Sequence, residues 1–91
     1  MNEQEIKQKL EDIKYMIEPI LDDNAIPRNI RRAVDEAKNK ISEINGDLDV
    51  KIASAIYSLD EVANDINMPF HARTDIWNLV KELEKLKEEL K

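Results

Sequence analysis

Apolar residues recur at alternating spacings of three and four along most of the chain, and they form four runs. This spacing places each run on one face of a helix, and no useful stretch alternates with the period of two that a half-buried strand needs. The runs are Ile6, Leu10, Ile13, Ile17, Ile20; Ile30, Val34, Ala37, Ile41, Ile44; Leu48, Ile52, Ala55, Leu59, Val62, Ile66; and Ile76, Leu79, Leu83, Leu86, Leu90. The sequence therefore predicts an all-α protein of four helices.

Polar and proline-containing segments separate the runs, at residues 22–27, 45–47 and 65–69. Proline is tolerated at the first position of a helix, so Pro27 and Pro69 are predicted to start the second and fourth helices. Gly46 suits a left-handed cap after the second helix, and Asp47 suits the N-cap of the third. Pro19 lies inside the first run, where it removes a backbone hydrogen bond. We expect the first helix to kink or break near residues 17–18 and to resume as far as Leu21.

The two halves of the chain match when the sequence is shifted by 42 residues, which equals six heptads. The matched pairs are Lys9 and Lys51, Tyr15 and Tyr57, Asp23 and Asp65, Pro27 and Pro69, Arg31 and Arg73, and Leu48 and Leu90. This pattern predicts two copies of a helical hairpin, at about residues 3–44 and 47–90. The recurring tyrosines are predicted to pack as a pair.

Two architectures fit such a repeat. A period near 42 residues is typical of HEAT and armadillo units, and the segment LDDNAIPRNIRRAVDEA resembles a HEAT turn. Two hairpins cannot cover both open ends of a solenoid, however, whereas short loops and heptad spacing favour one shared core. We predict a single domain over residues 1–91 that forms a four-helix up-and-down bundle, with two HEAT-like repeats as the alternative.

Two motifs carry a resemblance over nearly the whole chain: DD-x-x-x-PRNIRRA at residues 22–33 and NDINMPFHARTDIWNL at residues 64–79. Together they resemble a family of small archaeal proteins that is known only by a serial number as uncharacterised. The resemblance implies an archaeal source and a compact helical fold, and it implies no reaction.

Composition excludes several classes of function. The chain has 91 residues, 20 acidic against 14 basic, and a net charge of −6, which argues against bulk attraction to nucleic acid or to an anionic membrane. The absence of cysteine excludes disulfides, thiolate catalysis and zinc–thiolate sites. The first residues are polar and no apolar stretch is long enough to span a membrane, so we expect a cytoplasmic protein without membrane contact.

A cluster of cationic residues is predicted at one end of the bundle, because up-and-down topology brings the starts of the second and fourth helices together. Its cationic members are Arg28, Arg31, Arg32 and Arg73, and Asn29, His71 and Phe70 lie among them. One interpretation is structural: Asp23 pairs with Arg31 and Asp65 pairs with Arg73 within each turn. The other is an anion site at two helix N-termini, for which Arg28, Arg32 and His71 are the candidates.

Catalysis and metal binding have little support in the sequence. His71 is the only histidine, one glycine cannot form a phosphate loop, and no Ser–His–acid arrangement stands out. We therefore expect no enzyme activity, no metal and no cofactor.

Two further features bear on partners. Trp77 either covers the edge of the bundle or anchors a partner, since tryptophan is enriched at binding hot spots. The segment VKELEKLKEELK at residues 80–91 continues the heptad, and it either pairs with another copy as a homodimer or is covered by the first helix.

The predicted function is a small cytoplasmic protein-interaction module that docks on a protein or protein–RNA partner. Its candidate contact residues are Arg28, Asn29, Arg32, Phe70, His71 and Trp77. The alternative is a binder of phosphate-bearing small ligands or nucleotides at the paired helix N-termini, with weak anion or RNA contact.

Overall fold

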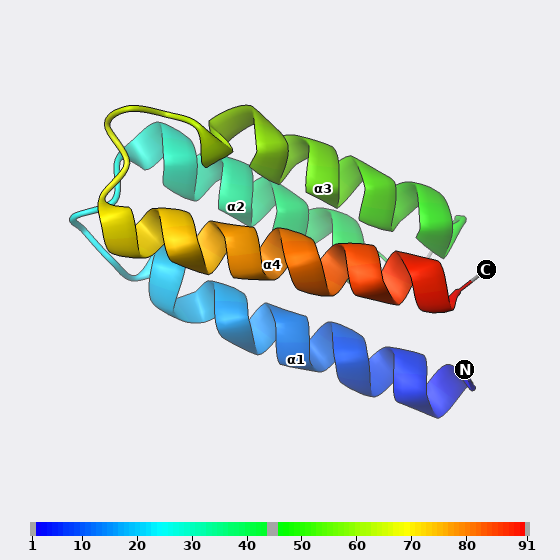
Figure 1. Ribbon diagram of the computed structural model, residues 1–91. Coiled ribbons are helices and arrows are strands. Elements are labelled where there is room, and N and C mark those ends of the chain that lie inside the picture. Colours follow the sequence, from blue (N-terminus) through cyan, green and yellow to red (C-terminus); the bar gives the residue numbers. More distant parts are fainter. Residues whose placement is uncertain (1, 44–45, 91) are drawn as a thin grey trace.

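The computed structural model describes residues 2–43 and 46–90, and Figure 1 shows its helices side by side, each antiparallel to the next along the chain. They are α1 (Glu3–Leu21), α2 (Arg28–Ser42), α3 (Leu48–Ala63) and α4 (Phe70–Glu89). No strand occurs among these residues. The predicted all-α fold is confirmed. Among the helices described, none combines the length and the apolar character that a membrane crossing requires.

The helices occupy the four corners of a bundle that measures 38 × 21 × 20 Å. α1 contacts α2 and α4, and α3 contacts the same two helices, whereas the described parts of α1 and α3, and of α2 and α4, lie on diagonals and do not meet. In stacked HEAT-like repeats α1 would lie beside α3, so these contacts favour the bundle. Both proline-containing loops lie at the same end of the molecule (Figure 1). We call this end the proline end.

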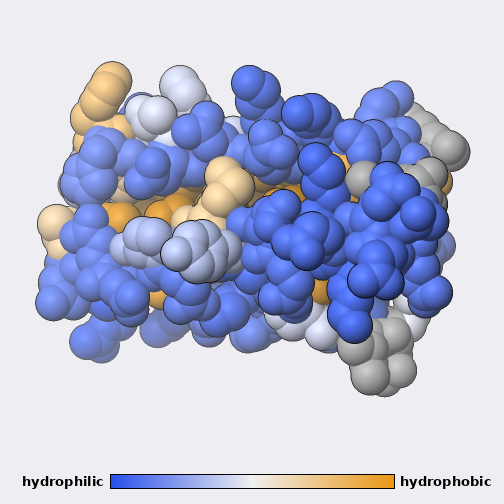
Figure 2. All heavy atoms as spheres, turned by 90° about the horizontal axis from the view of Figure 1, so that it is seen from below, coloured by the Kyte–Doolittle hydropathy of each residue, from blue (hydrophilic) through white to orange (hydrophobic). Residues whose placement is uncertain are grey.

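One apolar core extends between the four helices, and it is built from the predicted runs. Its largest fully buried side chains are Ile17, Ile20, Ile26, Ile30, Val34, Ile52, Leu59, Ile76, Leu79 and Leu83. On the face seen from below α1, interior apolar side chains show as an uneven line between hydrophilic side chains (Figure 2). The core is thin, as expected for a chain of this size.

Helix starts follow local capping chemistry. The Asn2 side chain accepts a hydrogen bond from the Glu5 amide at 2.8 Å, and Asp47 accepts one from the Asp49 amide at 3.0 Å. Asp47 thereby confirms the predicted N-cap. Pro27 and Pro69 stand one residue earlier than predicted, in extended conformation just before α2 and α4. Their carbonyls accept the first helical hydrogen bonds, and proline is tolerated at this position because its amide would have no partner within the helix.

Two expectations about helix ends need correction. Of the predicted kink or break near residues 17–18, the break does not occur: α1 runs through Pro19 and ends at Leu21, where the sequence predicted its end. Pro19 lies in the last turn on the exposed side, so it disturbs only the end of the helix. α2 ends at Ser42 with Glu43 as its C-cap, so Gly46, although its φ is +89°, comes after the cap and does not form it.

Other predicted positions fall outside the helices or outside the described chain. Ile66 was predicted to extend the apolar face of the third helix, but α3 ends at Ala63 and Ile66 is exposed in the following loop. Ile44 and Asn45, predicted at the end of the second helix and in the turn after it, lie outside the described residues.

Candidate interaction surface

The two loops of the proline end fold in the same way. The Asp23 carboxylate accepts a hydrogen bond from the Ala25 amide at 2.9 Å, and its carbonyl accepts one from the Ile26 amide at 3.1 Å. In the second loop Asp65 accepts corresponding bonds from the Asn67 amide at 2.9 Å and the Met68 amide at 3.2 Å. Aspartate favours such turns because its short side chain reaches the amide two residues on.

The second oxygen of each carboxylate reaches the other hairpin. Asp23 Oδ2 lies 2.8 Å from Nε2 of His71, at the start of α4. Asp65 Oδ2 accepts a hydrogen bond of 3.2 Å from Nδ2 of Asn29, at the start of α2. His71 and Asn29 are themselves 42 residues apart, so the two contacts correspond. We call them the cross-hairpin contacts, and they tie each loop to the helix start beside it.

Asp23 is held as a carboxylate by these contacts. The hydrogen bond to His71 lowers the pKa of Asp23 below its usual value, and the Ala25 amide lowers the pKa further. Partial desolvation opposes this shift, while the charges of His71 and, most weakly, Arg31 add to it.

The predicted ion pairs within each turn are not what the structure shows. Arg31 Nε donates to the carbonyl oxygen of Ile26 at 3.0 Å, and Arg73 Nη2 donates to that of Asp65 at 2.9 Å. No ion pair joins Asp23 to Arg31 or Asp65 to Arg73. Both guanidinium groups instead satisfy loop carbonyls, because a buried backbone acceptor without a partner is costly.

The structure divides the remaining predicted residues. Asn29 and His71 lie inside the cross-hairpin contacts. Arg28 and Arg32 are exposed on the outer side of α2, which lies on the diagonal from α4, and neither has a hydrogen bond or ion pair with a described residue. They therefore lie on a different corner of the bundle from Phe70 and Trp77 on α4.

Large exposed apolar side chains are more numerous on the second hairpin than on the first. The apolar periodicity does not predict this difference, because it identifies only the inward faces of the helices. The exposed fractions are 65% for Val50, 68% for Tyr57, 91% for Ile66, 85% for Phe70 and 55% for Trp77. These five residues are named the α3–α4 surface.

The corresponding positions of the first hairpin are mostly polar. Forty-two residues earlier the chain carries Gln8, Tyr15, Asn24, Arg28 and Asp35. Of these only Tyr15 is a large apolar residue, and it is 82% exposed. The predicted packing of Tyr15 against Tyr57 is wrong, because the two tyrosines point to solvent from helices on a diagonal.

A hollow of about 320 Å³ continues the α3–α4 surface away from the proline end. It is lined by Ala53, Ile56, Glu84, Lys87 and Glu88, so Glu84 faces the side of α4 that turns toward α3. Phe70 and Trp77 precede Glu84 at intervals of seven residues and therefore share its side of the helix.

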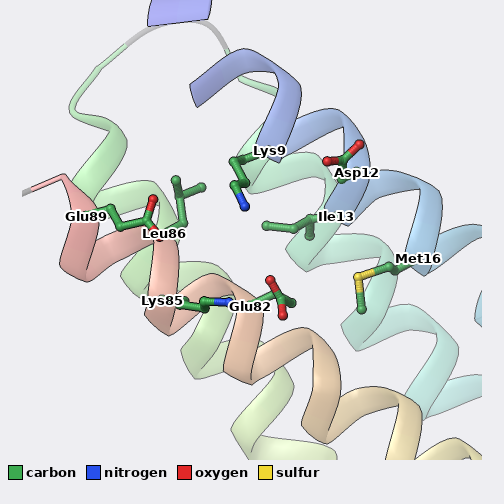
Figure 3. A pocket seen from close by; sticks show the side chains of 8 residues that line it. All are labelled: Lys9, Asp12, Ile13, Met16, Glu82, Lys85, Leu86 and Glu89. Atoms are coloured by element: carbon green, nitrogen blue, oxygen red, sulfur yellow. The ribbon is translucent and has the colours of Figure 1, made fainter. Parts of the chain in front are cut away.

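A smaller cleft of about 60 Å³ lies between α1 and α4. Figure 3 shows Lys9 and Glu82 projecting into it from the two helices. The lining alternates in charge, and no group of three or more metal-ligating side chains occurs in the described part of the chain. The cleft is small, and the exposed surface of α3 and α4 is the better candidate for binding.

The comparison with known proteins now decides the family. A family model described as "Uncharacterised protein family (UPF0147)" matches residues 1–86. The chain belongs to the UPF0147 family. A UPF0147 protein of Methanocaldococcus jannaschii is 44% identical over 78 residues, which cover 86% of this chain and 84% of the relative. A UPF0147 protein of Sulfurisphaera tokodaii is 40% identical over 87 residues, which cover 96% and 93%.

Two solved structures show the same fold. A UPF0147 structure from Thermoplasma acidophilum superimposes with a TM-score of 0.82 at 35% identity, covering 90% of this chain and 98% of the other. The "unknown function protein MMP1188" superimposes with a TM-score of 0.79 at 49% identity, covering 84% and 86%. The resemblance to a numbered family of archaeal proteins is confirmed. The names of these UPF0147 relatives state no activity.

Proposed function

We propose that this UPF0147 protein is a protein-interaction module whose contact surface is the α3–α4 surface. The observation that carries the proposal is the placement of large exposed apolar side chains on one hairpin at positions where the other hairpin is mostly polar. Large exposed apolar side chains that gather on one part of a domain typically mark a binding site.

The first hairpin serves as an internal control for the needs of the fold. Asn24 occupies the turn position of Ile66, and the backbone hydrogen bonds of the two turns correspond. Arg28 occupies the helix-start position of Phe70, and the proline carbonyl before each accepts the first helical bond. Because the polar residues Asn24 and Arg28 occupy the corresponding positions of a turn with the same backbone hydrogen bonds, folding does not require apolar residues there. We attribute Ile66 and Phe70 to binding.

The chemistry of the surface suits docking on a protein. Phenylalanine, tyrosine and tryptophan provide large contact areas with few rotatable bonds, and truncating such anchors typically costs about 2 kcal/mol or more of binding free energy. The role proposed is binding and not catalysis, and the proposed location is the cytoplasm, as the sequence predicts.

The geometry favours protein docking over the alternative of anion binding at the helix N-termini. His71, one of the three candidate anion ligands, already contacts the carboxylate of Asp23, and Asn29 at the start of α2 contacts that of Asp65. These carboxylates would also repel an anion.

Affinity capture with matched variants tests the proposal. The bait Ile66→Asn/Phe70→Arg/Trp77→Asp places the residues of the first hairpin on the second, so it should fold normally. In a lysate of archaeal cells that produce the protein, the wild type should retain at least one protein that this bait loses. Mass spectrometry identifies the difference, and thermal melting verifies that the bait is folded.

Tyr15→Ser is the control, because it removes a similarly exposed aromatic side chain from α1, which lies diagonally across the bundle from α3. It should retain the same protein as the wild type. If all three baits bind the same set of proteins, the α3–α4 surface is not the contact surface.

A further inference from the structure

We infer that the occupant of the α3–α4 surface is a basic amphipathic helix of another protein, which lies along the groove between α3 and α4. This inference rests on the proposed function and specifies the class of partner. Its support comes from the shape of the surface and from the charges around it.

The shape fits a helix. Phe70 and Trp77 stand two turns apart on the wall formed by α4, and Ala53 and Tyr57 stand one turn apart on the wall formed by α3. Beyond Trp77 the surface sinks into the hollow between Ala53, Ile56 and Glu84. An amphipathic helix whose apolar residues recur at i, i+3, i+4 and i+7 presents a ridge that matches two antiparallel walls with such spacing.

The charges around the groove are mainly acidic. Asp60 lies one turn beyond Tyr57 on α3, and Glu84 lies two turns beyond Trp77 on α4. Neither has a hydrogen bond or an ion pair with a described residue. The cations on the same side are Lys81 and Lys87, of which Lys87 lines the hollow together with Glu84 and Glu88, and the protein as a whole carries a net charge of −6. A partner with lysine or arginine on both flanks of its apolar stripe is therefore complementary.

A second copy of the chain does not offer such a helix. The apolar stripes of all four described helices face the shared core. The outer side of α2 has Arg28 and Arg32 but also Asp35 and Glu36, without a large apolar residue between them. Two copies joined through their α3–α4 surfaces would also bring together two chains of like net charge, −6 each.

Trp77 is the only tryptophan, so its fluorescence reports directly on the surface. The probe is a synthetic helical peptide of leucine and lysine, about 15 residues long, which matches the span of α3. It should shift Trp77 emission to shorter wavelength, and the shift should saturate in the micromolar range. A peptide of leucine and glutamate with the same pattern should give no saturable shift.

Two variants separate the contributions of charge and apolar contact. Asp60→Asn/Glu84→Gln should weaken binding of the lysine peptide by about tenfold, because it removes both flanking charges. Asp35→Asn/Glu36→Gln removes two charges from α2 and should leave binding unchanged. Phe70→Ser should weaken binding by at least about tenfold while keeping the Trp77 reporter.

Three results would overturn the inference. They are equal binding of the two peptides, unchanged binding by Asp60→Asn/Glu84→Gln, and emission of Trp77 that depends on protein concentration through self-association. The last would indicate that a second copy occupies the surface. In each case the capture experiment tests the proposed function separately. If a protein is lost only by the triple-substituted bait, the α3–α4 surface is still a contact surface, although its partner is not a basic helix.

Discussion

Asp23 holds two parts of the molecule with one carboxylate, because its oxygens contact both the Ala25 amide and the His71 ring. Asp65 does the same with Asn67 and with Asn29. Asn29 and His71 have corresponding roles, since each is the second residue of its helix and offers a nitrogen donor to a loop carboxylate. The proline end is therefore closed by side chains from both hairpins.

Asp23→Asn tests this arrangement through the pH dependence of stability. The folded state lowers the pKa of Asp23, so the unfolded chain takes up a proton first as the pH falls. The contribution of Asp23 is complete above its ordinary pKa and is lost as the pH falls through it toward the lower folded value. The substituted asparagine side chain keeps an acceptor for the Ala25 amide but cannot titrate.

The measurement is urea denaturation at a series of pH values. Between about pH 5 and pH 3, the wild type should lose more stability than the Asp23→Asn variant. Equal losses would mean that the contact with His71 does not persist in solution.

The sequence indicated the residues of the proline end but not their partners. Asp23 and Arg31 are eight residues apart across a turn, and this separation is compatible with a direct ion pair. The hydrogen-bond partner of the arginine depends on which backbone carbonyls of the turn lack another donor. The Ile26 carbonyl is one such acceptor, and Arg31 takes it because its planar guanidinium can donate in several directions.

At the scale of the elements, each helix is bounded by a local signal that the sequence displays. Asn2 and Asp47 cap α1 and α3 through side-chain oxygens, whereas Pro27 and Pro69 precede α2 and α4 without a side-chain cap. Apolar periodicity predicted the inward faces, and it failed at Ile66. Ile66 continues the three–four spacing of the third run, but α3 ends at Ala63, so no helix directs its side chain toward the core.

Pro19→Ala tests the continuity of α1. Alanine restores the amide that can donate to the Tyr15 carbonyl, and it removes the proline ring from the turn. Because α1 already runs through this position, the free energy of unfolding should rise by roughly 1 kcal/mol.

Pro69→Ala is the matched control, since it removes a proline from a position just before a helix. There the substitution only makes the unfolded chain more flexible, and it should lower the free energy of unfolding by about 0.5–1 kcal/mol. Chemical denaturation measures both changes. Shifts of the same sign would contradict the different roles assigned to the two prolines.

At the scale of the whole molecule, neither hairpin has a core of its own. α1 and α2 complete their burial against α4 and α3, and the ring of contacts closes between the first and last helices. The described parts of the two hairpins differ in what they expose: Tyr15 is the one large exposed apolar side chain of the first, and the second carries the α3–α4 surface. The two hairpins thus form one bundle, and one outer side of that bundle carries the large exposed apolar side chains.

Separated hairpins test the shared core. Fragments 2–43 and 46–90 should each show little helix by circular dichroism, because a single hairpin leaves one side of its apolar faces in water and isolated helices of this length are marginal. An equimolar mixture should regain helix and melt cooperatively. A fragment that melts cooperatively alone would show that the hairpin is an independent unit, as stacked repeats would allow.

The sequence by itself determined the four helices, their inward faces, the loop positions and the pairing of the proline-containing loops at one end, because periodicity and capping depend on residues near each other in the chain. Only the tertiary structure decided that Asp23 meets His71 and Asp65 meets Asn29, and that Phe70 and Trp77 lie on a different corner from Arg28 and Arg32. Those outcomes depend on how each helix is rotated within the bundle. A rotation of one residue position, about 100°, moves a side chain from one groove to the next, and packing against the neighbouring helices fixes it.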